Sequence, residues 1–201
     1  MNYLEKLYCG VPADHVLSIW SKTLNITEFH PIAELNQAEQ RLIELSKKGD
    51  VYHGWCPLKS QPVTGRGKSD DVGSSPGVMF DADLFSENPN VHKQTALPGS
   101  VDNVLNWLDE AEIDRPTQIR SSGNGLYLDW LHPEPVVFAT DVDRERYAKA
   151  VKGFHAALRK SALELRGWRF DNTSNLARVT RMPGTLNHKT NPPKPVEVLD
   201  V

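Results

Sequence analysis

An apolar, strand-like segment of the sequence ends in two carboxylates. Residues 78–80 are followed by Asp81, Ala82 and Asp83. Because the side chains of a strand alternate between its two faces, Asp81 and Asp83 point to the same face. Neighbouring carboxylates repel each other unless a cation lies between them, and hard divalent ions such as Mg²⁺ or Mn²⁺ favour oxygen ligands of this kind. The pattern fits a metal site, and an ordinary strand end that meets solvent would show the same residues.

A glycine-rich turn follows further along the chain, at Ser122-Gly123-Asn124-Gly125. Asn-Gly between two strand-like segments predicts a hairpin, because both residues tolerate a positive φ. The backbone N–H groups of such a turn can approach a ligand closely, a phosphate included. Tyr127 lies directly after the turn. A plain hairpin with an aromatic edge is the alternative interpretation.

A third segment combines one acid with a basic arm. Asp171 follows the apolar Phe170, and Arg178, Arg181 and Lys189 come after it, around a Pro-Gly turn. Arginine offers a planar fork of donors and lysine a point charge, and both suit a triphosphate. A solvated basic face is the alternative, since charge clusters commonly form one.

Taken together, these segments resemble the archaeo-eukaryotic primase superfamily, in particular the primase-polymerase domains of phage, plasmid and other mobile-element replication proteins. That family carries a D-x-D/E strand, an S-G-x-G-x-H hairpin, a lone acid after an apolar residue, and R-x-P-G-T-x-N-x-K. In this chain the motifs fall in the same order at Asp81 and Asp83, at residues 122–127, at Asp171 and at residues 181–189. The loop at 65–72 is also similar, and the resemblance runs from about residue 51 to the C-terminus.

The resemblance implies a role for each matched position. Two divalent metals, Mg²⁺ or Mn²⁺, would be held by three catalytic carboxylates: Asp81, Asp83 and Asp171. The incoming nucleotide would be contacted by five residues: Ser122, Gly123, Tyr127, Arg181 and Lys189. Tyr127 stands where the family has histidine, so it can donate a hydrogen bond but cannot supply the positive charge of an imidazolium. Weaker nucleotide binding is the expected consequence.

Contacts with DNA are expected at two further places. Arg66, in the long loop before the first acids, matches a position that could meet the template or the nucleotide. Trp168 lies between Arg166 and Arg169, and aromatic residues interleaved with arginines suit single-stranded nucleic acid. Three other tryptophans are expected in the core: Trp20, Trp55 and Trp107.

The function that the resemblance implies is that of a DNA primase and DNA-dependent polymerase. It would transfer nucleotides from NTPs or dNTPs onto a primer end or a first nucleotide, on a single-stranded DNA template. The expected protein is a monomer, with a helicase domain or protein as a further partner. A catalytically weakened nucleotide- and DNA-binding module of a replication initiator is one alternative, favoured by Tyr127. A metal-dependent nuclease is another, but the arm at 181–189 has no obvious use in hydrolysis.

Helical and strand-like patterns interleave along the chain, and one hairpin is clear, so an α+β fold with an antiparallel sheet is predicted. Helices are expected at 14–22, 36–48, 100–111 and 140–167. Strands are expected at 51–57, 77–81, 117–122, 126–131 and 195–201. Irregular segments are expected at 58–76 and 86–98.

The resemblance further implies an RRM-like antiparallel catalytic sheet over about 76–201, with an N-terminal α/β part over about 1–75. Together they would form a single domain over residues 1–201. The expected closing strand ends abruptly at the C-terminus, as it would in a fragment of a longer protein.

The charge of the chain is unevenly distributed. Lys and Arg total 23 against 26 Asp and Glu, a formal net charge of -3. Residues 144–189 hold 11 basic and 3 acidic residues, a balance of +8, which leaves 12 basic and 23 acidic residues, or -11, elsewhere. A local basic excess is the footprint expected for a phosphate backbone. The whole-chain charge therefore does not exclude a nucleic-acid partner.

Several classes of protein lose support from the remaining composition. The sequence lacks an apolar run of about 18 residues and an N-terminal signal pattern, so no membrane association is expected. Cys9 and Cys56 are too few for a disulfide framework, which favours the cytoplasm. Neither a GxGxxG nor a GxxxxGK[ST] phosphate loop is present in the sequence.

Overall fold

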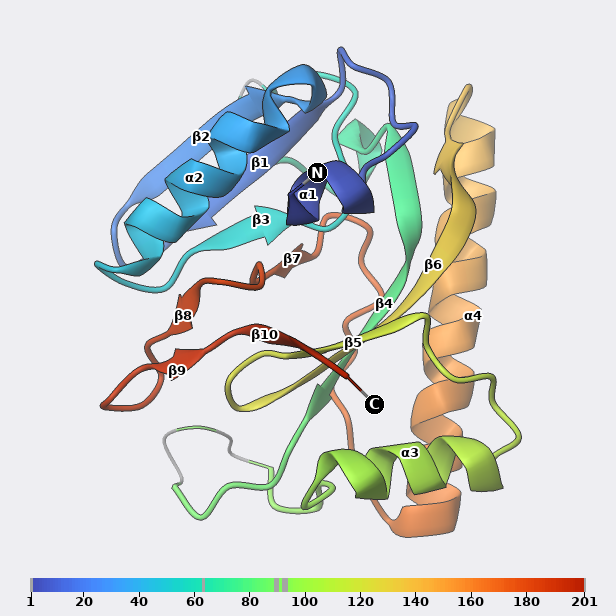
Figure 1. The fold of residues 1–201 in the computed structure, drawn as a ribbon. Coiled ribbons are helices and arrows are strands. Elements are labelled where there is room, and N and C mark those ends of the chain that lie inside the picture. Colours follow the sequence, from blue (N-terminus) through green and yellow to red (C-terminus); the bar gives the residue numbers. More distant parts are fainter. Residues whose placement is uncertain (1, 63, 89–90, 92–93, 201) are drawn as a thin grey trace.

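Two antiparallel four-stranded sheets form the framework of the protein (Figure 1). The structure, a computed structural model, describes residues 2–62, 64–88, 91 and 94–200. The helices are α1 (Tyr3–Leu7), α2 (Leu35–Ser46), α3 (Val101–Glu110) and α4 (Asp141–Arg166), with short 3-10 turns at Ile32–Glu34 and Ser69–Asp71. The strands are β1 (Val16–Ser21), β2 (Ile26–Pro31), β3 (Tyr52–Gly54), β4 (Ser74–Asp83), β5 (Gln118–Ser121), β6 (Gly125–Val137), β7 (Val179–Thr180), β8 (Leu186–Asn187), β9 (Lys194–Pro195) and β10 (Glu197–Leu199).

The first sheet has the order β2-β1-β3-β7 and is covered on one face by α2. Leu17 and Ile19 of β1 pack with Leu42 of α2 in one buried cluster. The helix predicted at 14–22 is wrong, because this segment forms β1 and pairs with β2. Its fully buried side chains recur every second residue, which is the period of a strand and not the 3.6-residue period of a helix.

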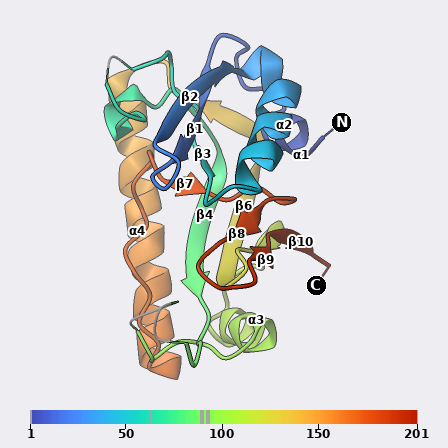
Figure 2. The same ribbon diagram turned by 90° about the vertical axis from the view of Figure 1, so that its left-hand side faces the viewer.

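The second sheet has the order β10-β5-β6-β4, and α3 and α4 cover one of its faces. Figure 2 shows the long helix α4 on one side of the molecule and α2 on the other. Phe80 of β4, Leu128 of β6 and Leu158 of α4 are all fully buried in the cluster between the sheet and these helices. Along the chain, the strands of this sheet and its two helices come in the order β4, α3, β5, β6, α4 and β10, and the strands pair antiparallel. This confirms the predicted α+β class with an antiparallel sheet.

Local signals in the sequence fix the ends of several elements. The side chain of Ser100 accepts a hydrogen bond from the backbone N–H of Asn103, which begins α3 as predicted. Thr140 and Asp143 form a capping box at the start of α4, and Gly167 ends that helix in the left-handed region, as the predicted range 140–167 implies. The predicted β5–β6 hairpin forms, but its positive φ of +87 is at Gly123, and neither Asn124 nor Gly125 has a positive φ, so the expected Asn-Gly conformation is wrong.

Other expected segments differ in extent. The helix predicted at 36–48 corresponds to α2, and β4 begins before the expected strand at 77–81. The short helix α1 and the strand β2 were not predicted. Residues 63, 89, 90, 92, 93 and 201, which belong to the two expected irregular segments and the closing strand, lie outside the described residues. The expected division near residue 75 stays a prediction, and the chain returns to the first sheet at β7.

A fully buried ion pair connects the two sheets. Arg120 of β5 donates from Nε and Nη2 to the carboxylate of Asp129 on β6, at 2.6 and 3.0 Å. Its Nη1 donates to Thr180 Oγ1 of β7 at 3.1 Å and to the carbonyl of Arg181 at 2.8 Å. A buried charge is tolerated only when it is paired and its hydrogen bonds are satisfied. Arg120 meets this condition by binding groups from both sheets at once.

Removing one partner of this pair is expected to destabilise the whole fold. Asp129→Ala leaves an uncompensated guanidinium in the interior and should lower the free energy of unfolding by about 3–5 kcal/mol. Urea denaturation followed by circular dichroism measures the change. The double variant Arg120→Met, Asp129→Leu should recover part of the loss. Asp109→Ala, which breaks an exposed pair with Arg115, is the matched control, and an equal loss there would contradict the prediction.

Candidate active site

Asp81 and Asp83 lie at the end of β4, on the face of the second sheet that is turned away from α3 and α4. Phe80 and Ala82 pack in the cluster beneath these helices, so the alternation of the strand directs both carboxylates to the opposite face. Tyr127 of β6 is the ladder partner of Asp81 on that face. The sequence-based expectation that the two acids share a face is therefore confirmed.

The carboxylate of Asp81 is bound by an arginine from the distant arm. Arg178 Nη2 donates to Asp81 Oδ2 at 2.8 Å, and the side chains are 38% and 19% exposed. The carbonyl of Arg178 accepts from the backbone N–H of Trp55, just after β3, at 2.8 Å. Arg178 thus contacts both sheets. Sequence analysis noted it in the basic arm but gave it no role, because nothing in the spacing reveals a partner 97 positions away.

The third predicted carboxylate is held apart from the other two. Asp171 is exposed, and the preceding Phe170 packs edge-on against Phe80 with ring centroids 5.4 Å apart. Among the described residues no group of three His, Cys, Asp or Glu side chains is close enough to hold a metal ion. The donor chemistry of Asp81 and Asp83 fits a hard divalent ion, and Arg178 shows that a cation is stable beside Asp81. The complete three-carboxylate set is not assembled in this structure.

Arg181 lies in the interior, although its segment, residues 181–189, was expected to contact phosphates. It is 4% exposed, and its Nη2 donates to Asp50 Oδ1 at 2.7 Å and to the hydroxyl of Tyr52 at 2.6 Å. Asp50 also accepts from the backbone N–H of His188 at 3.1 Å. These contacts fasten the arm to the first sheet. The guanidinium is therefore engaged within the protein, whereas Lys189 is exposed.

The hairpin turn borders a small polar groove of about 150 Å³. Gly123 and Gly125 line it together with Lys194 and the exposed Phe85. The β8–β9 hairpin is held against the turn by Asn187, whose Nδ2 donates to the carbonyl of Ser122 at 2.5 Å. A Cβ added to Gly123 would lie 3.1 Å from Cβ of Lys194, so the first side-chain atom of this lysine packs directly against the turn. Lys194 was not predicted, because it lies beyond the last family motif.

Tyr127, at the histidine position of the family motif, is almost fully buried. The Arg120 guanidinium lies over its ring, with Cζ 4.6 Å from the centroid. Burial raises the pKa of Tyr127, and the nearby charge of Asp81 adds to the shift. The phenol therefore stays neutral beside the acids and does not provide a cation.

The residues proposed for DNA contact fall at two ends of α4. Arg66 Nη1 donates to the carbonyl of Ala177 at 2.9 Å, in the region where the loop before β4 meets the start of α4. At the other end, Arg166 pairs with Glu110 of α3, and Trp168 packs edge-on against Trp107 at 6.2 Å. Arg169 is exposed there. The structure does not bring Arg166, Trp168 and Arg169 to the carboxylates of β4.

Part of the basic excess of residues 144–189 is used inside the protein. Four arginines of this segment pair with acids that lie outside it: Arg144 with Asp141 and Asp70, Arg166 with Glu110, Arg178 with Asp81, and Arg181 with Asp50. Exposed basic residues remain along α4: Arg146, Lys149 and Lys152. The segment therefore binds the chain's own acids as well as offering charge to solvent.

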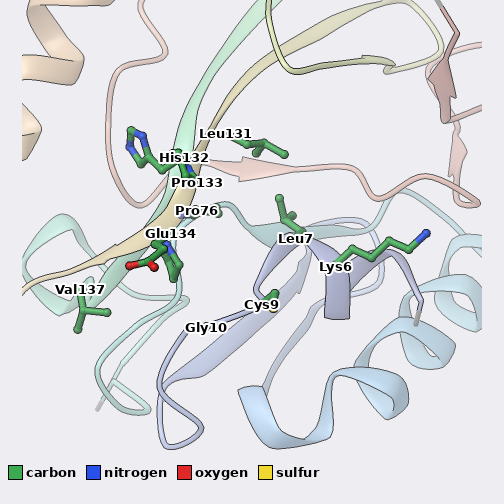
Figure 3. A pocket seen from close by; sticks show the side chains of 11 residues that line it. Lys6, Leu7, Cys9, Gly10, Pro76, Leu131, His132, Pro133, Glu134 and Val137 are labelled. Carbon is green, nitrogen blue, oxygen red and sulfur yellow. The ribbon is translucent and has the colours of Figure 1, made fainter.

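A wider groove of about 470 Å³ lies between α1 and β6 (Figure 3). Its lining includes Lys6, Cys9, His132 and Glu134 together with several prolines. None of the residues expected to act in catalysis or to bind nucleotide or DNA lines it. The groove is therefore separate from the candidate active site.

Comparison with solved structures agrees with this architecture. The AEP domain of the primase-polymerase of cyanophage S-2L matches with a TM-score of 0.55 at 14% identity, over 98% of this chain and 85% of that one. The catalytic domain of primase RepB′ in complex with initiator DNA matches with a TM-score of 0.48 at 14% identity, over 98% of this chain and 84% of that one. No family model matches the sequence, and no curated protein matches it.

The fold of the chain is thus that of an archaeo-eukaryotic primase-polymerase domain, as the sequence motifs predicted. Within the described residues, none of the helices has the length and apolar character needed to cross a membrane.

The position of Arg181 gives a testable difference from Lys189. Arg181→Met leaves the Tyr52 hydroxyl without the guanidinium and the Asp50 carboxylate with the backbone N–H of His188, and should lower the free energy of unfolding by about 2–3 kcal/mol. Lys189→Met should leave it nearly unchanged. Urea denaturation of the two variants measures both effects, and an equally small effect in both would show that Arg181 does not fasten the arm.

Proposed function

We propose that this chain is a primase-polymerase that transfers nucleotidyl groups along a single-stranded DNA template. The 3′-hydroxyl of a primer, or of a first nucleotide, attacks the α-phosphate of an incoming NTP or dNTP, and pyrophosphate leaves. The observation that carries the proposal is the carboxylate pair of Asp81 and Asp83, on the face of β4 that is turned away from α3 and α4, within a primase-polymerase fold. A helicase partner stays a prediction from the resemblance, and so does the monomeric state.

Asp81 and Asp83 would hold divalent metal, Mg²⁺ or Mn²⁺, with Asp171 as the proposed third carboxylate. When bound, such ions make the attacking hydroxyl more acidic and neutralise charge on the phosphates. Two residues of the chain hold the side chain of Asp81 in place. Arg178 binds Asp81 by a charge-assisted hydrogen bond, and Tyr127 packs beside Asp81 without adding charge.

The nucleotide phosphates would lie along the hairpin turn. Ser122 and Gly123 form that turn, the groove beside it reaches Gly125, and Gly125 faces Asp83 in the ladder. Lys189 and Lys194 are the cations proposed for this side, since the guanidinium of Arg181 is taken up by Asp50. Backbone N–H groups and lysine ammonium groups in such positions stabilise the negative charge that develops on a transferring phosphoryl group.

A nucleotide- and DNA-binding module without catalysis is the second candidate. Two observations favour it: Arg178 occupies one carboxylate of the proposed metal site, and Tyr127 replaces a residue that could carry charge. The two candidates differ in whether bound nucleotide is converted into product.

Synthesis on single-stranded DNA is the decisive experiment. The protein is incubated with template, labelled NTPs or dNTPs and Mg²⁺ or Mn²⁺, with and without a primer. Polymeric product is expected, and Asp81→Asn should reduce its rate by at least about 100-fold, the size of effect seen when one transition-state contact is removed. Asp109→Asn, on the exposed surface of α3, is the matched control and should retain full synthesis.

Other outcomes identify the alternatives. Binding of nucleotide and template without product supports the binding module, and shortening of the template supports a nuclease. Full synthesis by both Asp81→Asn and Asp171→Asn would overturn the assignment of the site.

The Arg178–Asp81 pair predicts competition with metal. Arg178→Gln removes the cation beside Asp81 and should increase Mn²⁺ affinity by about two- to fivefold, the range expected for a partly exposed ion pair. Titration of Mn²⁺ followed by electron paramagnetic resonance, without nucleotide or DNA, measures it. Arg146→Gln is the control at an exposed arginine near the start of α4. Unchanged or weaker Mn²⁺ binding by Arg178→Gln would contradict the competition.

A further inference from the structure

Trp20 lies outside the core that was predicted for it. Trp107 is fully buried and Trp55 is 4% exposed, as expected, but Trp20 is only partly buried. It lies on β1, directly opposite Tyr52 of β3 in the antiparallel ladder. Leu17 and Ile19 of the same strand belong to the buried cluster with α2, so Trp20 faces the other side of the first sheet.

On that side, aromatic rings and guanidinium groups alternate. Cζ of Arg66 lies 5.1 Å from the centroid of the Trp20 ring. The Trp20 and Tyr52 rings are 5.6 Å apart and tilted by 39°. Cζ of Arg181 lies 4.4 Å from the centroid of Tyr52. Arg66 is held in a turn between two glycines with positive φ, so it approaches the ring from a loop and not from the sheet itself.

This row of side chains lies next to the carboxylates of β4. Arg66 donates to the carbonyl of Ala177, the residue before Arg178, and Arg178 binds Asp81. Burial raises the pKa of Tyr52 to about 12, and the charges of Asp50 and Asp81 contribute to the rise after the opposing effect of Arg181. The charge of Asp81 thus acts on the pKa of the Tyr52 hydroxyl. The exposed Lys68 follows Arg66 in the same loop.

We propose that Trp20 is a stacking platform for an unpaired nucleobase of single-stranded DNA, and that Arg66 and Lys68 bind its phosphates. Every base presents a π-face, so a partly exposed indole flanked by cations binds single strands with little sequence preference. Tyr52 packs beside Trp20 across the ladder, and Arg181 lies over the ring of Tyr52. The proposal rests on the proposed function, because it supplies the template site for the same carboxylates.

Binding of a fluorescein-labelled dT₂₀ oligonucleotide, measured by anisotropy in EDTA without nucleotide, tests the platform. Trp20→Leu should weaken binding by about 5- to 150-fold, the effect of losing one base–aromatic stack. Trp20→Phe should retain most of the affinity, because it keeps a ring. Trp130→Leu is the matched control at a partly buried tryptophan of β6 that packs against Phe154, and it should bind nearly as the unmodified chain does. Trp168→Leu tests the other expected contact with DNA.

Two further measurements separate stacking from a structural effect. Unlabelled dT₂₀ should quench the tryptophan fluorescence of the unmodified chain, and clearly less that of Trp20→Phe at saturation. The loss caused by Trp20→Leu should be the same at low and high salt, whereas Arg66→Gln should reduce the salt dependence of binding. Equal quenching in Trp20→Phe, or an affinity loss in Trp168→Leu and not in Trp20→Leu, would overturn the proposal.

The experiment also distinguishes this inference from the proposed function. A chain that binds dT₂₀ through Trp20 but makes no product retains the platform and loses the polymerase assignment. A chain that synthesises DNA and binds dT₂₀ equally well with and without the indole retains the polymerase assignment and loses the platform.

Discussion

A guanidinium and a carboxylate that are both fully buried, those of Arg120 and Asp129, hold the two sheets of this protein in a fixed relation. Removing two charges from water costs several kcal/mol per ion, and good geometry with full hydrogen bonding is needed to offset it. Asp129 accepts two hydrogen bonds from Arg120, whose remaining donor group reaches Thr180 and the carbonyl of Arg181. The arm after α4 is thus bound to the centre of the molecule at the point where it enters the first sheet.

The same guanidinium lies over the ring of Tyr127. Tyr127 lies under Arg120, and a neutral ring attracts a cation through its negative π-face, whereas an imidazolium at that distance would be repelled. Tyr127 in turn lies beside Asp81, so its neutrality leaves Arg178 as the cation that contacts this carboxylate in the structure. The electrostatics beside the acids therefore follow from a buried pair on the neighbouring strands.

The sequence predicts what depends on neighbouring residues and misses what depends on distant ones. The α+β class, the positions at which α3 and α4 begin, and the shared face of the β4 acids follow from local patterns, and all were confirmed. The segment predicted as a helix at 14–22 forms β1, since its most deeply buried side chains, those of Leu17, Ile19 and Ser21, recur at every second position. The partners of Arg178 and Arg181 lie about a hundred positions or more away, so no spacing could show that one binds Asp81 and the other an interior acid.

The segment between Phe170 and Arg178 is attached at both ends. Phe170 is packed into the cluster beneath α3 and α4, and Arg178 is bonded through its carbonyl to the first sheet and through its side chain to β4. The freedom of Asp171 to approach Asp81 therefore belongs to a short tethered loop and not to a hinge between the sheets. A movement that completes the proposed carboxylate set would therefore be local, and it would leave the two sheets, with Trp20 on one and Asp81 on the other, in the same relation.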